Sequence, residues 1–299
     1  MSEPKRHHYL PQSYLENFSN DGGVWVYNDK DKTIKKIPKL NVAVISHFYT
    51  RENKDGTKDY ELEKKLSVIE CEASNVIKKL ISKEQISLEE KGEFALYIAL
   101  LQHRTPFAIN RLHQFIDPVL EWVYGLQKQN GAYDKFIEEY EQTHDMSIEM
   151  QKELLENSEL QLTKSGEWGL LFDTAIQIAK LYSQMDWHFI YTTKSTFITS
   201  DNPLIYYEPK FDTGVYGYGV ATPTVEKIIP ITSDLILQIG DFGNKLSYGL
   251  LNDKKIIRYI NTSIFVRRKQ FVYANNKELL EFLLKRTNDY KYKEIIRIN

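Results

Sequence analysis

The sequence is poor in cysteine, and this shortage excludes several kinds of site. A single cysteine, Cys71, cannot form a disulfide within the chain or supply a multi-cysteine zinc or iron–sulfur centre. Such sparse usage is typical of a reducing compartment, so we predict a cytoplasmic location. The run 68–73 around Cys71 has helical character, which predicts a buried structural thiol rather than a nucleophile.

Long hydrophobic runs are also missing. No window approaches the ~18 consecutive apolar residues of a membrane-spanning helix, so we expect no membrane partner. The N-terminal segment does not resemble a secretory signal, because its longest apolar run before Pro11 is Tyr9-Leu10. We therefore expect the segment to belong to the working protein.

Net charge is almost absent, since 39 basic residues face 41 acidic ones and leave a formal charge of −2. A broad electrostatic grip on nucleic acid is therefore unsupported, although a local basic patch would still bind a phosphate backbone. The HExxH, Walker-type, GxGxxG and GxSxG motifs are missing as well. Any catalytic site must therefore be assembled from residues that are scattered along the chain.

What the sequence does contain is a helical middle between two regions of strand-like pattern. Near the N-terminus, the β-prone runs 24–27 and 33–37 flank a polar turn and predict a hairpin, and 42–45 and 47–50 predict a further strand. From 59 onward the apolar residues recur at helical spacing. Ser87 and Glu90 form a capping-box pattern for a second helix, which Pro106 should bend or interrupt. More helices are predicted near 107–128, 133–142, 147–157 and 167–185.

The C-terminal part returns to strand-like patterns. Strands are predicted at 187–191, 196–199, 204–207, 227–231, 235–239 and 270–274, and helices at 253–267 and from Asn276. We therefore predict an α+β fold in which a central helical block packs on a mixed sheet built from N-terminal and C-terminal strands. A single domain over 1–299 is expected, with a β-rich segment at 1–58, the helical block at 59–185 and a second β-rich segment with terminal helices at 186–299.

The first candidate motif contains the neighbouring histidines His7 and His8. In an extended chain neighbouring side chains point to opposite sides, so one imidazole would do the chemistry. An imidazole titrates near pH ~6.5 and suits general acid–base catalysis or metal binding. The alternative is a histidine that merely hydrogen-bonds the core.

The second motif, 102–106, places Arg104 at the end of the most apolar helix. Its guanidinium would either clamp a phosphate or carboxylate, or cap the C-terminus of the helix. The third motif, 197–203, places Asp201 at the end of a strand. Asp201 would either take part in catalysis or metal binding, or build a tight turn with Asn202.

Two glutamates extend the list of candidates. Glu63 and Glu70 are seven residues apart on a predicted helix and therefore share one face. With Asp201 or a histidine they would offer carboxylates to a divalent ion such as Mg²⁺ or Mn²⁺; the alternative is ordinary solvation. The amide and hydroxyl groups nearest the three motifs are expected to bind the ligand, and they belong to Gln12, Gln102, Ser200 and Asn202.

Together the three motifs carry a family resemblance. The segments HHYLPQSYLENF (7–18), QHRTP (102–106) and FITSDNP (197–203) resemble the hallmarks of the bacterial domain-of-unknown-function family 4238. Pro230 and Asn261 also fall where that family has a proline and an asparagine. The resemblance implies that the three polar motifs are shared features, and it favours a common site assembled from them. It implies no particular activity.

The leading hypothesis is a nuclease-like or other phosphoester-acting enzyme, acting as a toxin or anti-phage defence protein on nucleic acid or nucleotides. A histidine of the pair His7-His8 would act as acid or base, Arg104 would stabilise phosphate charge, and Asp201 would orient the histidine or hold a metal. The alternative is a non-catalytic sensor that recognises a phage component, a phage or host protein, or a small anionic ligand. A third hypothesis is a purely structural cluster that locks the N-terminus onto the core.

Overall fold

A computed structural model describes residues 6–52, 57–129, 161–207, 219–222 and 224–288, together with a few positions between 135 and 153. The chain divides into two compact units, one formed by 1–107 with 172–299 and the other by 108–171. The single domain over 1–299 stays a prediction. Apart from those few positions, the helices predicted near 133–142 and 147–157 lie outside the described residues.

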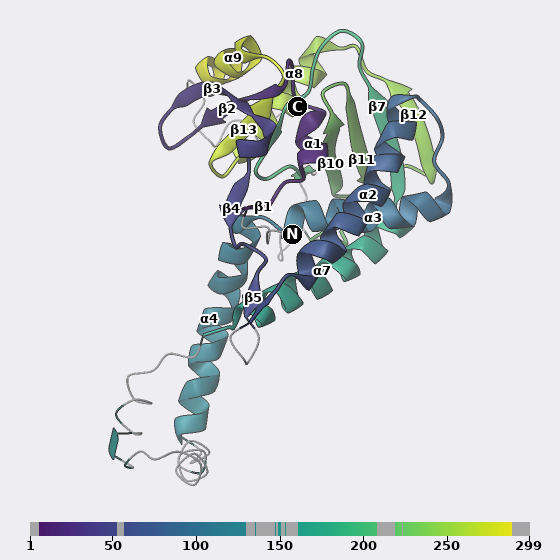
Figure 1. Ribbon diagram of the computed structural model, residues 1–299. Helices are drawn as coiled ribbons and strands as arrows, with labels where there is room; N and C mark the ends of the chain where they lie inside the picture. Colours follow the sequence, from purple (N-terminus) through teal and green to yellow (C-terminus); the bar gives the residue numbers. More distant parts are fainter. Residues whose placement is uncertain are drawn as a thin grey trace. The chain divides into compact units, whose positions relative to one another are not determined.

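The first unit contains a four-stranded antiparallel sheet that joins the two ends of the chain (Figure 1). Its strands are, in spatial order, β3 (Thr33–Pro38), β2 (Gly23–Asn28), β13 (Phe271–Ala274) and β8 (Thr199–Ser200). The predicted hairpin is confirmed, with Val24 opposite Ile37. The α+β prediction, with strands from both ends in one sheet, is confirmed as well.

A second sheet of the same unit has five strands. In spatial order they are β12 (Leu246–Leu250), β7 (Asp186–Tyr191), β11 (Leu235–Gly240), β10 (Glu226–Thr232) and β9 (Ile205–Tyr207). The pair β12–β7 is parallel and the other pairs are antiparallel, so the sheet is mixed. The sequence did not predict β12, because its central residues Ser247 and Gly249 interrupt the apolar pattern.

Two long helices, α2 (Glu61–Ile81) and α3 (Leu88–His103), pack on one face of the five-stranded sheet (Figure 1). The predicted capping box is present, since Ser87 and Glu90 exchange side-chain and backbone hydrogen bonds. Phe94 of α3 contacts Trp187 of β7, with ring centroids 6.1 Å apart. Pro106 opens the next helix instead of continuing α3, as predicted, because proline fits the first turn of a helix but not its interior.

The predicted apolar stripe of α2 is largely confirmed. Its buried members are Leu62, Leu66, Ala73, Val76, Ile77 and Leu80. The prediction of a buried Cys71 is wrong, because this side chain is exposed. Cys71 lies two positions from Ala73, which is roughly 200° around an α-helix, so the two side chains point to opposite sides.

The core between the two sheets is filled by α8 (Lys254–Arg267), and α9 (Lys277–Asn288) packs beside α8 on the same face of the four-stranded sheet. One cluster of buried side chains joins both sheets to α8, for example Val272 of β13, Ile236 of β11 and Ile264. The side chain of Asp253 caps α8 by accepting the N–H of Lys255. Both helices were predicted within a few residues of their bounds.

The N-terminal segment runs through short elements beside these sheets. They are β1 (Arg6–His8), α1 (Gln12–Glu16), η1 (Lys39–Asn41), β4 (Val44–Ser46), β5 (Arg51–Glu52) and β6 (Lys58–Asp59). The strand predicted at 42–50 is shorter than expected: β4 pairs with β1, and 47–50 forms a turn. α1 bridges the two sheets, because the hydroxyl of Tyr14 bonds Thr199 Oγ1 and donates to the Pro230 carbonyl, each at 2.7 Å.

The second unit is described by itself. It takes in most of α4 (Pro106–Gln129) and the beginning of α7 (Lys164–Gln184). His113 joins the two helices, with its ring nitrogens 3.1 Å from Asp117 and 2.8 Å from Glu167. Among the described helices of the whole chain, none is long and apolar enough to cross a lipid bilayer.

A buried lysine in the five-stranded sheet leads to a prediction about pH. Burial lowers the pKa of Lys227 to about 8, and its ammonium donates to the Val225 carbonyl at 2.6 Å. In the unfolded chain the lysine titrates near ~10.4. Between about pH 8 and this value the unfolded chain therefore binds more protons than the folded one, and the free energy of unfolding rises with pH. We expect wild type to gain about 1 kcal/mol relative to Lys227→Met between about pH 7 and pH 9.

Urea unfolding at several pH values measures this difference. Lys180→Met, at an exposed position of α7, is the matched control and should run parallel to wild type. A constant difference between wild type and Lys227→Met across this range would contradict the prediction.

Candidate functional site

The second motif reaches the N-terminal motif through Arg104, the C-terminal cap residue of α3. The side chain is buried, with 3 % exposure. Its Nε donates to the Tyr49 hydroxyl at 3.0 Å, Nη1 to Glu70 Oε1 at 2.5 Å and Nη2 to the His8 carbonyl at 2.7 Å. The guanidinium therefore holds the N-terminal strand against α2 and α3, and it does not point into a solvent-filled site.

His7 is enclosed in the same cluster and is 1 % exposed. Its Nδ1 accepts the backbone N–H of Tyr49 at 2.8 Å, so the ring proton lies on Nε2. Nε2 is 3.1 Å from Glu63 Oε2, and the ring stacks on Tyr49 at 5.4 Å between centroids. This histidine is held from both sides, which is the core-bonded alternative for the first motif.

His8 points away from His7, as expected for neighbours in a strand. The side-chain amide of Gln12 lies 3.3 Å from its Nδ1. Burial lowers the pKa of His8, with smaller opposing contributions from a backbone carbonyl and Glu70. A neutral, half-buried imidazole at pH 7 has the form a general base requires.

The candidate metal ligands Glu63 and Glu70 both take part in these contacts. Glu63 faces His7, and Glu70 pairs with Arg104. Burial and then the charge of Glu70 raise the pKa of Glu63. Among the described residues, no group of three or more histidine, cysteine, aspartate or glutamate side chains is arranged to hold a metal ion.

The third motif serves a different loop. Asp201 is 6 % exposed, and its carboxylate accepts three backbone N–H groups at the start of β13. Oδ1 accepts Lys269 at 2.9 Å, and Oδ2 accepts Gln270 at 2.7 Å and Phe271 at 3.0 Å. Burial raises the pKa of Asp201, and these three bonds oppose the shift. The carboxylate thus fixes the connection between α8 and β13.

The residues beside Asp201 have similar partners. The hydroxyl of Ser200 donates to the Asn202 carbonyl at 2.9 Å and accepts the Asn202 N–H at 3.2 Å. The side-chain amide of Asn202 donates to the Arg267 carbonyl at 3.0 Å, at the end of α8. The local bonds of the third motif are thus made by Ser200, whereas the side chains of Asp201 and Asn202 bind the connection between α8 and β13.

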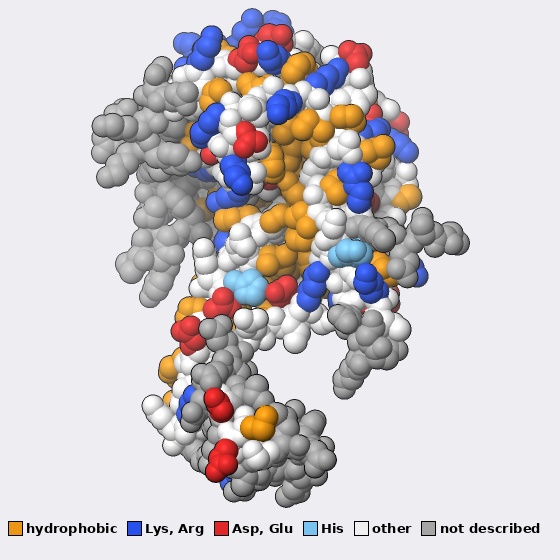
Figure 2. All heavy atoms as spheres, turned by 60° about the vertical axis from the view of Figure 1, so that its left-hand side comes forward, with side chains coloured by type: hydrophobic (Ala, Val, Ile, Leu, Met, Phe, Trp, Pro, Cys, Tyr) orange, Lys and Arg blue, Asp and Glu red, His pale blue; other side chains and the backbone are white. Residues whose placement is uncertain are grey.

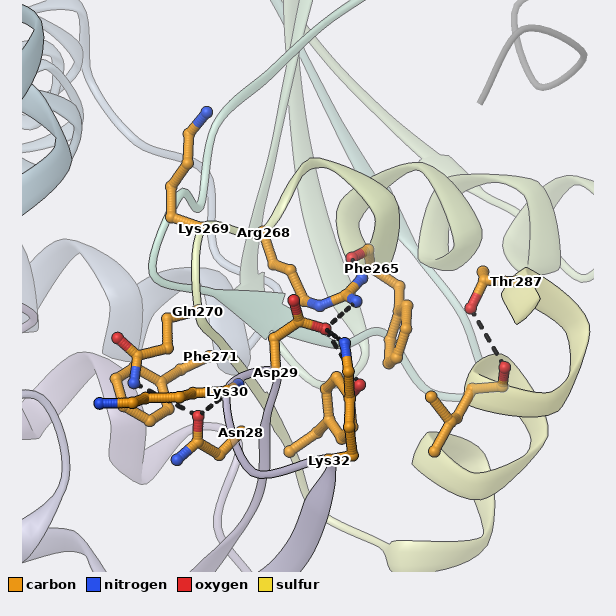
Figure 3. A network of polar contacts seen from close by, with 12 residues as sticks. Asn28, Asp29, Lys30, Lys32, Phe265, Arg268, Lys269, Gln270, Phe271 and Thr287 are labelled. Atoms are coloured by element: carbon orange, nitrogen blue, oxygen red, sulfur yellow. Dashed lines mark hydrogen bonds and ion pairs between the residues drawn. The ribbon is translucent and has the colours of Figure 1, made fainter. Parts of the chain in front are cut away.

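The connection between α8 and β13 is also held by the hairpin turn between β2 and β3 (Figure 3). Arg268 forms a short ion pair with Asp29 in the hairpin turn, and Lys32 donates to Asp29 at 2.9 Å. The Arg268 guanidinium also lies 4.4 Å from the Phe265 ring centroid. Burial alone would raise the pKa of Asp29, but the hydrogen bonds from Arg268 and Lys32 outweigh it and lower the pKa to about 2.

Gln102 links three elements on its own. Its Nε2 donates to the Tyr206 hydroxyl of β9 at 2.7 Å, and its Oε1 accepts the Tyr182 hydroxyl of α7 at 3.2 Å. The first and third motifs also approach each other, because the Tyr9 and Tyr273 hydroxyls are 3.2 Å apart. The fold therefore brings the motifs together through Arg104 and the tyrosines, while Asp201 binds backbone.

Pro230 and Asn261, the proline and asparagine of the family pattern, also form hydrogen bonds within the chain. The Pro230 carbonyl accepts the Tyr14 hydroxyl. Asn261 of α8 accepts the Ile198 N–H at 3.1 Å and donates to the Thr196 carbonyl at 2.8 Å. The signature residues thus bind loops and strand ends of their own chain, which is what a framework requires.

A different part of the first unit is hollowed. A pocket of about 630 Å³ opens on the face of the five-stranded sheet opposite α3. Along β7, Trp187 and Phe189 are buried toward α3, while His188 and Ile190 line the pocket on the other side. α8 forms a wall with Lys255, Ile256, Tyr259 and Ile260. A volume of 300–1,000 Å³ is typical of small-molecule sites.

The floor of this pocket has a polar end. His188 of β7 lies opposite Gln238 of β11 in register, and the amide of Gln238 donates to Glu226 of β10 at 2.5 Å. Burial lowers the pKa of His188. The other floor positions on β7, β10 and β11 are the isoleucines at 190, 228 and 236. The polar end therefore combines an imidazole, a carboxamide and a carboxylate on an otherwise apolar surface.

The sequence alone did not predict this pocket. A signal existed in the polar residues His188 and Gln238 within otherwise apolar strands, but the register between β7 and β11 could not be read from one sequence. On the face drawn in Figure 2, basic and acidic side chains are interspersed, in keeping with the small net charge.

Comparison with known protein families gives a match over nearly the whole chain. No match to the chain was found among curated proteins or solved structures. A family model described as "protein of unknown function (DUF4238)" matches residues 6–278, which is nearly the whole chain and contains all three motifs. The chain therefore belongs to the domain-of-unknown-function family 4238.

Proposed function

We propose that this protein is a non-catalytic binding protein whose ligand occupies the pocket between α8 and the five-stranded sheet. The observation that carries the proposal is the pocket itself: about 630 Å³, a largely apolar lining and a few polar side chains gathered at one end. Natural sites for small molecules have this composition, because apolar walls supply affinity and a few polar groups fix the orientation.

The contacts of the signature motifs support a structural role for their residues, separate from ligand binding in the pocket. Arg104 is engaged by Glu70, Tyr49 and the His8 carbonyl, so a phosphate would have to compete with contacts that are already made. Asp201 is engaged by three backbone N–H groups. These residues support the framework that holds the sheet and α8 in place, and the pocket supplies the recognition.

Phosphoester chemistry is the second candidate, and one observation favours it. His8 has a lowered pKa and is therefore neutral at pH 7, and its carbonyl binds Arg104 of the ion pair with Glu70. In that function His8 would be the general base and the effector role, as toxin or anti-phage protein, would follow from cleavage of nucleic acid. The cytoplasmic location stays a prediction under either function.

A binding titration tests the proposed function. We expect the neutral probe 1-naphthalenemethanol to bind wild type saturably, as measured by its fluorescence. Ile256→Trp places an indole at the half-exposed wall of α8 and should lower the affinity for the probe at least about fivefold. The matched control Ile81→Trp, at a similarly exposed isoleucine of α2, should bind as wild type does.

Two outcomes would count against the proposal. Absence of saturable binding to folded wild type by any naphthyl probe would refute the pocket as a ligand site. The other is turnover: wild type and His8→Ala are assayed on RNA, DNA and nucleotides, with and without Mg²⁺ or Mn²⁺. Hydrolysis by wild type that disappears in a folded His8→Ala variant would establish the second candidate instead.

A further inference from the structure

We propose that the cavity between α8 and α9 is a second binding site, for a small organic phosphate. It has a volume of about 230 Å³ and lies on the other side of α8 from the pocket of the proposed function. Lys254, Arg258 and Asn261 share one face of the helix and line this cavity. Lys255 and Ile256 line the larger pocket instead. The inference therefore goes beyond the proposed function and does not depend on it.

Two of the side chains that line the cavity are cations without a carboxylate partner. Lys254 and Arg258 can only donate hydrogen bonds, because ammonium and guanidinium groups have no acceptor atom. Among the described residues, no carboxylate lies within ion-pair distance of either side chain. Glu281 of α9 pairs with Lys277 at 2.9 Å instead, and none of the residues that line the cavity is acidic. The lining is therefore positively charged.

Asn261 adds a buried donor to these cations. Its side chain belongs to a residue that is 1 % exposed, and its Oδ1 already accepts the Ile198 N–H. Its Nδ2 carries two N–H bonds, of which one donates to the Thr196 carbonyl at 2.8 Å. In the described part of the chain, the second N–H has no partner. A buried donor without a partner costs free energy, which a ligand oxygen in the cavity would recover.

The donors are held in place by contacts within the protein. The bond from Asn261 to Thr196 ties the loop after β7 to α8, and this loop brings the Ser195 hydroxyl to the cavity. The Arg258 guanidinium lies 5.3 Å from the centroid of the Phe282 ring. A guanidinium that stacks on a ring keeps the N–H groups at its edge available for an oxyanion. The site is therefore largely formed before a ligand binds.

The ligand class follows from these donors and from the opposite wall. A phosphate monoester carries nearly two negative charges and three strong acceptor oxygens, which match two cations and the donors of Ser195 and Asn261. α9 supplies an apolar wall that consists of Leu279, Phe282 and Leu283. The volume is below the roughly 300–1,000 Å³ of sites for drug-sized molecules, so the organic part should be about as large as one aromatic ring.

Titration calorimetry with phenylphosphonate tests the inference, because the P–C bond of this probe resists hydrolysis. At about pH 8 its head carries nearly two negative charges. We expect saturable binding to wild type, at least about tenfold tighter than that of phenol, which lacks the charged head. Inorganic phosphate lacks the ring and benzoate carries one charge, so both should bind at least about threefold more weakly than phenylphosphonate.

Three variants separate this cavity from a general attraction to the basic start of α8. Arg258→Gln should lower the affinity for phenylphosphonate at least about tenfold, and Lys254→Gln at least about threefold. Lys255→Gln is the matched control, because this neighbouring lysine lines the larger pocket, and it should change the affinity less than about twofold. Melting temperatures show whether each variant is folded, and Arg258→Gln should still bind 1-naphthalenemethanol as wild type does.

Three results would overturn the inference. The first is the absence of saturable phenylphosphonate binding to folded wild type, which would leave the proposed function untouched because that function is tested with a neutral probe in the other pocket. The second is an equal loss of affinity in Lys255→Gln and Arg258→Gln, which would indicate diffuse electrostatic attraction. The third is tighter binding of benzoate than of phenylphosphonate, which would contradict the phosphate head.

Discussion

Replacing Arg104 by methionine is expected to lower the free energy of unfolding by about 3–5 kcal/mol, measured by urea denaturation. The substitution keeps much of the side-chain length but removes the charge that faces Glu70 at 2.5 Å. It also removes the donor that the His8 carbonyl accepts at 2.7 Å. The cost arises because the Glu70 carboxylate, which is 25 % exposed, and the part-buried His8 carbonyl lose the buried guanidinium as their partner.

Two further variants show whether the ion pair is the cause. Glu70→Gln in the Arg104→Met background should recover at least about 1 kcal/mol, since the uncompensated charge is gone. Arg51→Met removes the ion pair with Asp59. The Arg51 side chain is 30 % exposed, so this change should lower the free energy of unfolding by no more than about 1 kcal/mol. An unchanged stability of Arg104→Met together with loss of a phosphoester-cleaving activity would contradict the structural role.

Asp201→Asn is expected to cost about 2–4 kcal/mol in the same measurement. The carboxylate accepts the N–H groups of Lys269, Gln270 and Phe271 with both oxygens. An asparagine keeps one oxygen and turns an amide N–H₂ toward at least one of these donors, so a buried N–H loses its acceptor. The connection between α8 and β13 should therefore loosen before the rest of the sheet.

Hydrogen exchange locates this effect. The amides of residues 269–271 should exchange faster in Asp201→Asn than in wild type. Asp253→Asn is the control, because that aspartate caps α8 at an exposed position through one bond to Lys255, and it should cost less than about 1 kcal/mol. Full protection of 269–271 in a folded Asp201→Asn variant would show that the carboxylate is not what holds the loop.

Local features of the fold could be predicted because they depend on neighbouring residues. The turn between β2 and β3, the capping box at Ser87 and the helix boundary at Pro106 are all set by a few positions of sequence. The prediction for Cys71 failed although the apolar stripe of α2 was recognised: the stripe already marks the side that faces the core, and Cys71 lies off it.

The candidate site could be predicted only in part. Arg104 and the N-terminal histidines were expected to meet, and Arg104 does bind the His8 carbonyl. Each motif had two readings, however, and the choice between them depends on residues far away in sequence, such as Tyr49 for Arg104 and Lys269 for Asp201. The pocket depends on strand register and on how much of the sheet α8 leaves open, which no local pattern contains.

The central claim is that a ligand binds between α8 and the five-stranded sheet, and a crystal structure of wild type soaked with 1-naphthalenemethanol tests it most directly. The account predicts electron density for the naphthyl ring beside Ile236 and Ile256. Density at a different place, or an unoccupied pocket at a saturating concentration of the probe, would contradict it.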